Sequence, residues 1–264
     1  MGVREIARQL HVAPSIAQRL IKTLAKVGFL EQTDTTLRYM IGYKAFQVGN
    51  AFVGQNNLHS AVLPELCALA EQHINGFLGV FRDRSIVYLA TVQSNGPVAI
   101  NHRPGAQTYL HSTAMGKALL AEMPENEVRA MLTQRPIPRL TPHTKISVPQ
   151  LMAELQEARH LGYATSDEEN RLGFFSAGAV VRDSNGNVIG VISGAVPSTG
   201  LKSQDRARIA RLVVEAAHNA SRKLGAPNTS RVFDITRARP ITQMSSKPAA
   251  RKPPRRRKRV AAGY

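Results

Sequence analysis

Five polar side chains between residues 15 and 26 recur at intervals of three or four, which is the spacing of one face of a helix. Their hydroxyl, amide, guanidinium and ammonium groups are the groups that contact base edges and phosphates in nucleic acids. We expect base-edge contacts from Ser15, Gln18 and Arg19. We expect phosphate contacts from Lys22, Lys26 and the later Arg38. The alternative is a solvated amphipathic hairpin that binds nothing.

The elements that must position these side chains are typical of a winged helix-turn-helix. Residues 3–10 have apolar side chains at i, i+3, i+4 and i+7, which predicts a short helix. After a turn-length break, a second helix begins near Pro14 and ends at Gly28, because Pro suits a first helical turn and Gly a helix end. Two β-like runs at 29–32 and 37–40 form the wing, and the second helix suits the major groove. The expected buried stripe of the second helix is Ile16, Leu20, Leu24 and Val27.

The net charge of the 264 residues is +17, and it is unevenly spread. Residues 1–44 have a net charge of +4, residues 45–224 of +3 and residues 225–264 of +10. The last segment has several prolines and no apolar period, so we expect a basic disordered tail. Such a tail binds polyanions without sequence preference; the alternative is a solvated tail with no dedicated role.

Composition narrows the class of protein. Hydrophobic residues make up 43% of the chain, enough for a substantial core. No apolar run approaches the roughly 18 residues that span a bilayer, and no signal-peptide pattern is present. The single cysteine, Cys67, falls in a helical apolar pattern, so we expect a buried structural thiol in a reducing, cytoplasmic setting.

Residues 43–62 are expected to form one helix that connects the DNA-binding unit to the rest of the chain. Its apolar side includes Phe46 and Phe52, together with small residues that permit close packing. This helix is too apolar for a free linker. Docking against a second copy, which would join two DNA-binding units, and packing within one chain are equally consistent with the pattern.

The segment 63–224 predicts an antiparallel sheet with helices on its face, an α+β module. Strands at 77–81 and 86–92 flank a polar turn, and Asn185-Gly186 joins a second hairpin of 174–182 and 188–196. A further short strand is expected at 98–102, and a loop rich in Pro and Thr at 135–148. The expected helices are 63–75, 113–123, 125–132, 148–161 and 204–224.

Several motifs, in this order, resemble the IclR family of transcriptional regulators. The run EIARQLHVAPSIAQRLIKTLAKVGFLEQ resembles the family's helix-turn-helix. The run HSTAMGKALLAE at 111–122 is similar to its most recognisable motif. DEENRLG at 167–173 and SAGAVVRDSNGNVIGVISG at 176–194 follow in the family's order. The resemblance covers residues 2–224.

The resemblance implies a winged helix-turn-helix DNA-binding domain at 1–42, a connecting helix at 43–62 and a GAF-like effector-binding domain at 63–224, followed by the tail at 225–264. Members of the family are homodimers or homotetramers that bind double-stranded operator DNA. They respond to small organic acids or aromatic metabolites, and both repressors and activators occur. We therefore expect a DNA operator, a small-molecule effector and a second copy as partners, and no membrane.

The resemblance also implies an effector pocket between the helix opened by HSTAMGK and the two late strands. A helix N-terminus suits a carboxylate, and two serine hydroxyls add hydrogen-bonding groups. For each serine, bonding to its strand neighbours is an equal alternative. Asp167 and Glu169 precede the first late strand, where they would gate or structure the site. The expected pocket residues are Ala114, Met115, Phe174, Ser176, Ser193 and Ala195.

One departure from the family pattern and the lack of catalytic motifs complete the prediction. The family has a further helix before residues 3–10, which this chain lacks, so either the start is misassigned or the DNA-binding unit is incomplete. The alternative function is thus a ligand-binding module with only nonspecific nucleic-acid affinity from its tail. Met115-Gly116-Lys117 is not a complete phosphate loop, and GVISG around Ser193 is not a nucleophile elbow. We expect neither an enzyme nor a metal or other cofactor.

Overall fold

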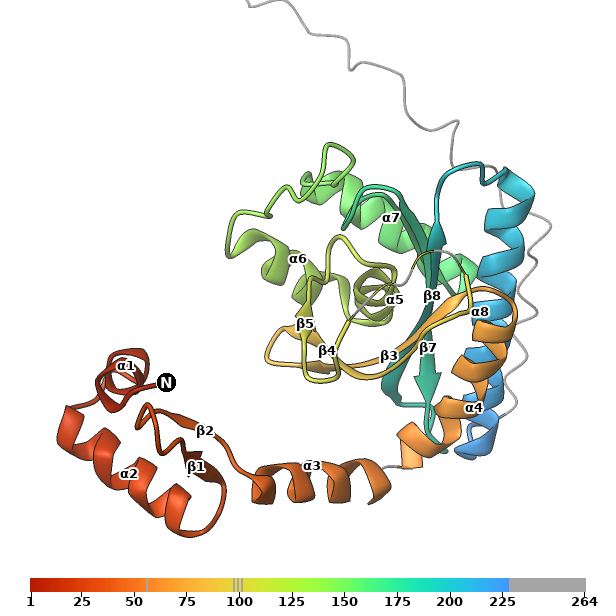
Figure 1. The fold of residues 1–264 in the computed structure, drawn as a ribbon. Helices are drawn as coiled ribbons and strands as arrows, with labels where there is room; N and C mark the ends of the chain where they lie inside the picture. The colour runs from red at the N-terminus through yellow and green to blue at the C-terminus, as the bar shows by residue number, and fades with distance from the viewer. Residues whose placement is uncertain (56, 97, 99, 101, 228–264) are drawn as a thin grey trace, which may run out of the picture.

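A computed structural model describes residues 1–55, 57–96, 98, 100 and 102–227. A small N-terminal unit of two helices and a two-stranded ribbon is joined by helix α3 (Tyr43–Gln55) to a larger α+β domain (Figure 1). Of the predicted strand at 98–102, residues 98, 100 and 102 are described, and they are not in a strand. Of the predicted tail at 225–264, only residues 225–227 are among the described residues.

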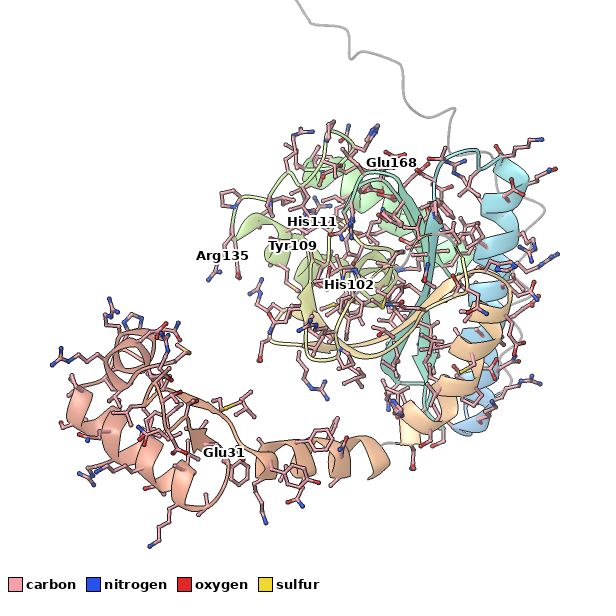
Figure 2. All side chains as sticks on the ribbon, viewed as in Figure 1. Glu31, His102, Tyr109, His111, Arg135 and Glu168 are labelled. Carbon is pink, nitrogen blue, oxygen red and sulfur yellow. The ribbon has the colours of Figure 1, made fainter. Side chains whose placement is uncertain are left out.

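The small unit confirms the predicted winged helix-turn-helix. Helices α1 (Val3–Gln9) and α2 (Pro14–Lys26) precede the antiparallel strands β1 (Leu30–Gln32) and β2 (Tyr39–Ile41). Gly28 follows α2 with φ +80°, a conformation that glycine adopts without steric cost. Glu31 Oε1 accepts a 3.0 Å hydrogen bond from the Tyr43 N–H, which ties the ribbon to the start of α3 (Figure 2).

The predicted buried stripe of α2 is wrong. Ile16, Leu20, Leu24 and Val27 are 49%, 50%, 42% and 52% exposed. The helix instead buries Ala17 and Ile21, which pack with Ala7 of α1. Because successive helical residues are about 100° apart, a shift of one residue turns a different face inward. The small Ala17 lets α1 approach closely, and the larger side chains beside it are left at the surface.

The predicted boundary between the connecting helix and the next helix is also wrong. Helix α4 (Asn57–Glu71) begins earlier than expected and continues through Pro64. Its buried side chains are Leu58, Ala61, Val62, Leu66 and Leu69. Cys67 is exposed, contrary to prediction, because it lies off this stripe. The helix stops before Asn75 and Gly76, which pair with another strand and so cannot end α4 as predicted.

The larger domain is built on a six-stranded antiparallel sheet in the order β5-β4-β3-β8-β7-β6. The two predicted hairpins are confirmed, and Gly186 takes φ +81° in the second turn. Strand β6 was not predicted, because four residues are too few for a clear alternation. The strands are β3 (Asn75–Arg82), β4 (Ser85–Val92), β5 (Gln107–Thr108), β6 (Ala164–Asp167), β7 (Phe174–Arg182) and β8 (Val188–Pro197).

Helices cover both faces of this sheet (Figure 1). One face packs against α4 and α8 (Ser203–Lys223), with a core that includes Phe175 and Val213. The other packs against α5 (Ala114–Glu122), α6 (Glu125–Thr133) and α7 (Val148–Leu161), near their predicted bounds. Eight of the nine residues of α5 are buried, so this helix is a core element. None of the described helices is both long and apolar enough to cross a membrane.

Candidate functional site

The predicted DNA-contacting side chains of α2 share one exposed face. Ser15, Gln18, Arg19, Lys22 and Lys26 are all exposed. At about 100° per residue they span one side of the helix, opposite the buried Ala17 and Ile21. Nothing in the small unit covers this side, so its hydrogen-bonding groups are free to meet a large polyanion.

Arg38 differs from the other predicted contacts because its guanidinium has a partner. Its Nη2 lies 3.0 Å from Glu5 Oε2, an ion pair that ties the wing to α1. The same carboxylate oxygen accepts a 3.3 Å hydrogen bond from the Gly2 N–H. The Arg38 side chain is still 59% exposed, so it keeps donors toward solvent while its position is held.

Two further cations of the small unit, Arg4 and Arg8, were not among the predicted DNA contacts. Arg4 and Arg8 are exposed on α1 and, with His11, Val12 and Pro14 among others, line a cavity of about 540 Å³ at the turn between the helices. Their i, i+4 spacing places both on one face of α1, and this spacing is visible in the sequence.

The six predicted effector residues come together on the α5 face of the sheet. Ser176 lies opposite Ala195 in the β7–β8 register, and Gly178 lies opposite Ser193. Paired residues of antiparallel strands share a face. Gly178 in turn meets the start of α5: a Cβ there would lie 2.7 Å from the carbonyl carbon of Ala114. The close approach of β7 to α5 therefore depends on a glycine at 178.

The start of α5 presents hydrogen-bond donors. Thr113 caps the helix, its Oγ1 accepting a 3.1 Å bond from the Gly116 N–H. In the described part of the chain, the N–H groups of Ala114 and Met115 have no partner, as expected for a first turn. The hydroxyls of Ser176 and Ser193 likewise make no hydrogen bond with any described residue. The alternative in which these serines bond to strand neighbours is not observed.

Aromatic rings form a wall beside these groups. Tyr88 stacks on His102 at 4.7 Å between ring centroids, and Phe77 meets Tyr88 edge-on at 5.8 Å. Phe77 lies opposite Ser193 in the β3–β8 register, so this wall belongs to the same face. Figure 2 shows His102 inside the larger domain. These three residues were not among the predicted effector residues, because no local sequence pattern indicates that their side chains are in contact.

A cation, Arg171, lies near this wall: it contacts Phe174, and its charge acts on His102. The Arg171 guanidinium lies 5.2 Å from the centroid of the Phe174 ring, a cation–π contact. Burial, together with the charge of Arg171, lowers the pKa of His102, so His102 is neutral near pH 7. Burial also raises the pKa of Tyr88 to about 12. The rings of Tyr88 and His102 are thus uncharged near pH 7, and the positive charge beside them comes from Arg171.

Comparison with known proteins decides the family. The profile described as "Bacterial transcriptional regulator IclR C-terminal" matches residues 53–222, and the "IclR helix-turn-helix domain" matches residues 1–34. The chain belongs to the IclR family. It is a DNA-binding transcriptional regulator, and the relatives that it matches are regulators and repressors rather than enzymes.

Individual relatives agree with this assignment. The chain is 29% identical to the regulator KdgR of Dickeya chrysanthemi, over 85% of this chain and 74% of that protein. It is 27% identical to the repressor AllR of Escherichia coli K12, over 85% and 83%. The crystal structure of Thermotoga maritima IclR matches with a TM-score of 0.68 and 27% identity, over 85% of this chain and 91% of that one.

A fourth relative carries a ligand. The 4-hydroxybenzoate complex of an IclR homologue from Microbacterium hydrocarbonoxydans matches with a TM-score of 0.73 over 85% of this chain and 91% of that one. At 22% identity this likeness shows the shared fold alone.

A buried ion cluster fixes the segment that holds Arg171 in this IclR-family protein. The fully buried Lys117 Nζ donates to Glu169 Oε1 at 2.7 Å and to Glu154 Oε1 at 2.8 Å. Lys145 pairs with the same two carboxylates at 2.8 and 3.5 Å. Despite its burial, Glu154 has a lowered pKa because of the two lysines, whereas burial and the charge of Glu154 raise the pKa of Glu169. Glu169 is therefore held in this buried ion cluster.

Proposed function

We propose that this IclR-family regulator acts in the cytoplasm and binds its operator by placing α2 in the major groove. Residues 1–42 would contact DNA, α3 (Tyr43–Gln55) would connect the two parts, and the larger domain from α4 to residue 224 would bind the effector. The observation that supports DNA reading is that the five polar side chains of α2 gather on one exposed side of the helix. Ser15, Gln18 and Arg19 meet base edges there, while Lys22, Lys26 and Arg38 meet phosphates.

The DNA proposal is tested with duplexes selected from a random pool by the parent protein. Gln18→Ala should change the preferred sequence, whereas Lys22→Ala should weaken all sequences alike and lower the salt slope by about one. Binding is measured by fluorescence anisotropy at several salt concentrations. Lys202→Ala, remote from the small unit, is the control. An unchanged sequence preference for variants at all three base-contacting positions would refute this arrangement.

We further propose that the α5 face of the sheet binds a small organic anion with an aromatic or short aliphatic body. The support is the pair of unbonded hydroxyls, Ser176 and Ser193, facing a helix start with free N–H groups. Arg171 adds the positive charge. Ala114, Met115, Phe174 and Ala195 would shape the pocket, and Phe77 and Tyr88 would form its wall.

The effector proposal is tested with 4-hydroxybenzoate, benzoate, pyruvate and glyoxylate as probes. At least one should shift the affinity for the selected duplex. Ser193→Ala and Arg171→Gln should each raise the concentration required by about tenfold, because a charged or desolvated hydrogen bond is lost. Operator affinity without the probe should stay unchanged, as it should in Arg103→Gln, an exposed arginine used as the control. A probe that acts with equal potency on both variants would place the effector elsewhere.

We also propose that the protein is a homo-oligomer, assembled in part through α3. Tyr43, Phe46 and Phe52 are 65%, 59% and 57% exposed on this helix, which is unusual for aromatic side chains. A second copy packed on α3 would cover them and bring two α2 helices together. Sedimentation of Phe46→Ser should show a smaller species than the parent at equal concentration, and an unchanged mass would contradict an α3 interface.

A further inference from the structure

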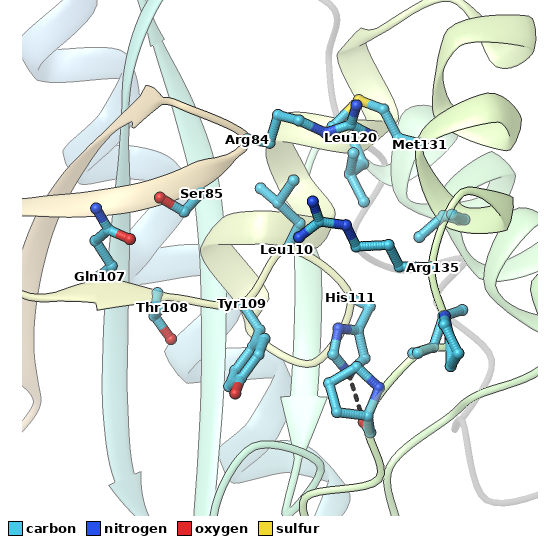
Figure 3. Close-up of a pocket in the computed structure, with 14 residues that line it drawn as sticks. Arg84, Ser85, Gln107, Thr108, Tyr109, Leu110, His111, Leu120, Met131 and Arg135 are labelled. Carbon is cyan, nitrogen blue, oxygen red and sulfur yellow. Dashed lines mark hydrogen bonds between the residues drawn. The ribbon is translucent and has the colours of Figure 1, made fainter. Parts of the chain in front are cut away.

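The larger domain has a cavity of about 450 Å³ that none of the six predicted effector residues lines. We refer to it as the α6 groove, because it lies between the end of α6, the β4–β5 edge and the segment before α5 (Figure 3). Its lining is Arg84, Ser85, Gln107, Thr108, Tyr109, Leu110, His111, Leu120, Met131, Leu132, Arg135, Pro136, Ile137 and Pro138. We propose that the α6 groove binds a monocarboxylate with an apolar body.

The floor of the groove is apolar. Leu110, Leu120, Met131, Leu132 and Ile137 contribute aliphatic or thioether surface from three separate segments of the chain. Its volume falls in the usual range of small-molecule sites, which are concave and mainly apolar with a few polar groups. An apolar body can therefore be removed from water here.

Positive charge at the rim selects the head group. Arg84 and Arg135 both line the groove, and no aspartate or glutamate does. Arg84 Nη1 donates to Gln134 Oε1 at 2.6 Å, which holds its guanidinium in place. Arg135 makes no ion pair or hydrogen bond with any described residue. In Figure 3 the Arg135 side chain reaches over the groove toward Leu110. A guanidinium matches a carboxylate through two parallel hydrogen bonds, so an anionic ligand would complete the site.

The wall of the groove is held by a buried histidine that carries no charge near pH 7. His111 Nε2 lies 3.0 Å from the Pro138 carbonyl oxygen (Figure 3). Because a carbonyl only accepts, Nε2 bears the proton and Nδ1 is an acceptor in the neutral ring. Burial, with the charge of Lys117 beside it, lowers the pKa of His111. The contact ties the loop that carries Arg135 to the segment that precedes α5.

This position connects the groove to the start of α5. The Tyr109 carbonyl accepts a 2.6 Å hydrogen bond from Thr113 Oγ1, the cap of that helix. A ligand in the groove therefore contacts the segment that caps α5, while the groove and the predicted effector residues have no residue in common. The proposal does not depend on the proposed effector site.

Titration calorimetry of the full-length protein with octanoate, without DNA, tests the proposal. Octanoate should bind, whereas octan-1-ol, which lacks the charge, and acetate, which lacks the apolar body, should bind at least about tenfold more weakly. Arg135→Gln should weaken octanoate binding by about tenfold, and Arg84→Gln should weaken it as well. Arg139→Gln, in the same loop but outside the groove, is the matched control and should bind like the parent.

Two further measurements locate the ligand. Arg171→Gln, on the effector face, should leave octanoate affinity unchanged; a loss there would place octanoate at that face and overturn the proposal. Octanoate should slow amide exchange at residues 109–117 in the parent and not in Arg135→Gln. The proposal would be overturned if octanoate did not bind, or if Arg139→Gln weakened binding as much as Arg135→Gln does. It would also be overturned if the protein self-associated and Arg135→Gln abolished that association, because a second copy would then occupy the groove.

Discussion

Lys117 is the side chain on which the ion cluster depends, because its ammonium group is fully buried between two carboxylates. Removing one partner of a buried ion pair leaves an uncompensated charge. Lys117→Met should therefore destabilise the larger domain by about 3–5 kcal/mol, measured by urea unfolding. The control is Arg129→Met, which breaks the exposed pair with Glu125 and should cost under about 1 kcal/mol. If both variants lost the same unfolding free energy, the buried ion cluster would contribute no more to stability than the exposed pair does.

His111 gives the larger domain a dependence on pH. Its pKa in the folded state lies below the ordinary 6.5, so the fold favours the neutral ring. Its contribution to stability is therefore complete above pH 6.5 and is lost as the pH falls below that value. Unfolding free energy should fall less between about pH 7.5 and 5.5 in His111→Asn than in the parent. His160→Asn, at an exposed position, should show the same fall in unfolding free energy as the parent. A steeper fall in His111→Asn than in the parent would contradict a lowered pKa of His111 in the folded state.

At the scale of elements, the rotation of α2 decides which of its apolar side chains stabilise the small unit. Ile21 is 3% exposed and Leu24 is 42% exposed. Ile21→Ala should cost about 2 kcal/mol or more, because it leaves a cavity in a small core, while Leu24→Ala should cost under about 1 kcal/mol. Amide exchange of residues 14–26 in the full chain measures both. A large loss for Leu24→Ala would mean that another surface covers the exposed stripe.

At the scale of the whole molecule, the two parts differ in the size of their cores. The small unit buries Ala7, Ala17 and Ile21, whereas the core of the larger domain extends over both faces of a six-stranded sheet. Amides in residues 1–42 should therefore exchange well before those in β7 and β8. Adding the selected DNA duplex should slow exchange in residues 1–42 more than in the sheet. Equal protection of both regions without DNA would contradict the difference in stability.

The sequence by itself determined the features that depend on neighbours along the chain. Gly28 and Gly186 take positive φ at the helix end and the hairpin turn where they were expected. The helix expected at 113–123 is α5, and Thr113 is its N-cap. The family resemblance indicated Ser176 and Ser193 as pocket residues, and the β7–β8 register brings them to one face. Motif order was enough to indicate the family, which the comparisons confirm.

The tertiary structure decided which face of each helix meets a partner. Periodicity shows that α2 has an apolar side, but the position of α1 chose Ala17 and Ile21 over Leu20 and Leu24. Cys67 lies outside the buried stripe of α4 for the same reason. The ion cluster around Lys117, the wall that includes His102 and the α6 groove each join segments far apart in sequence. Burial and pairing of this kind depend on which surfaces meet in space, and no local pattern carries that information.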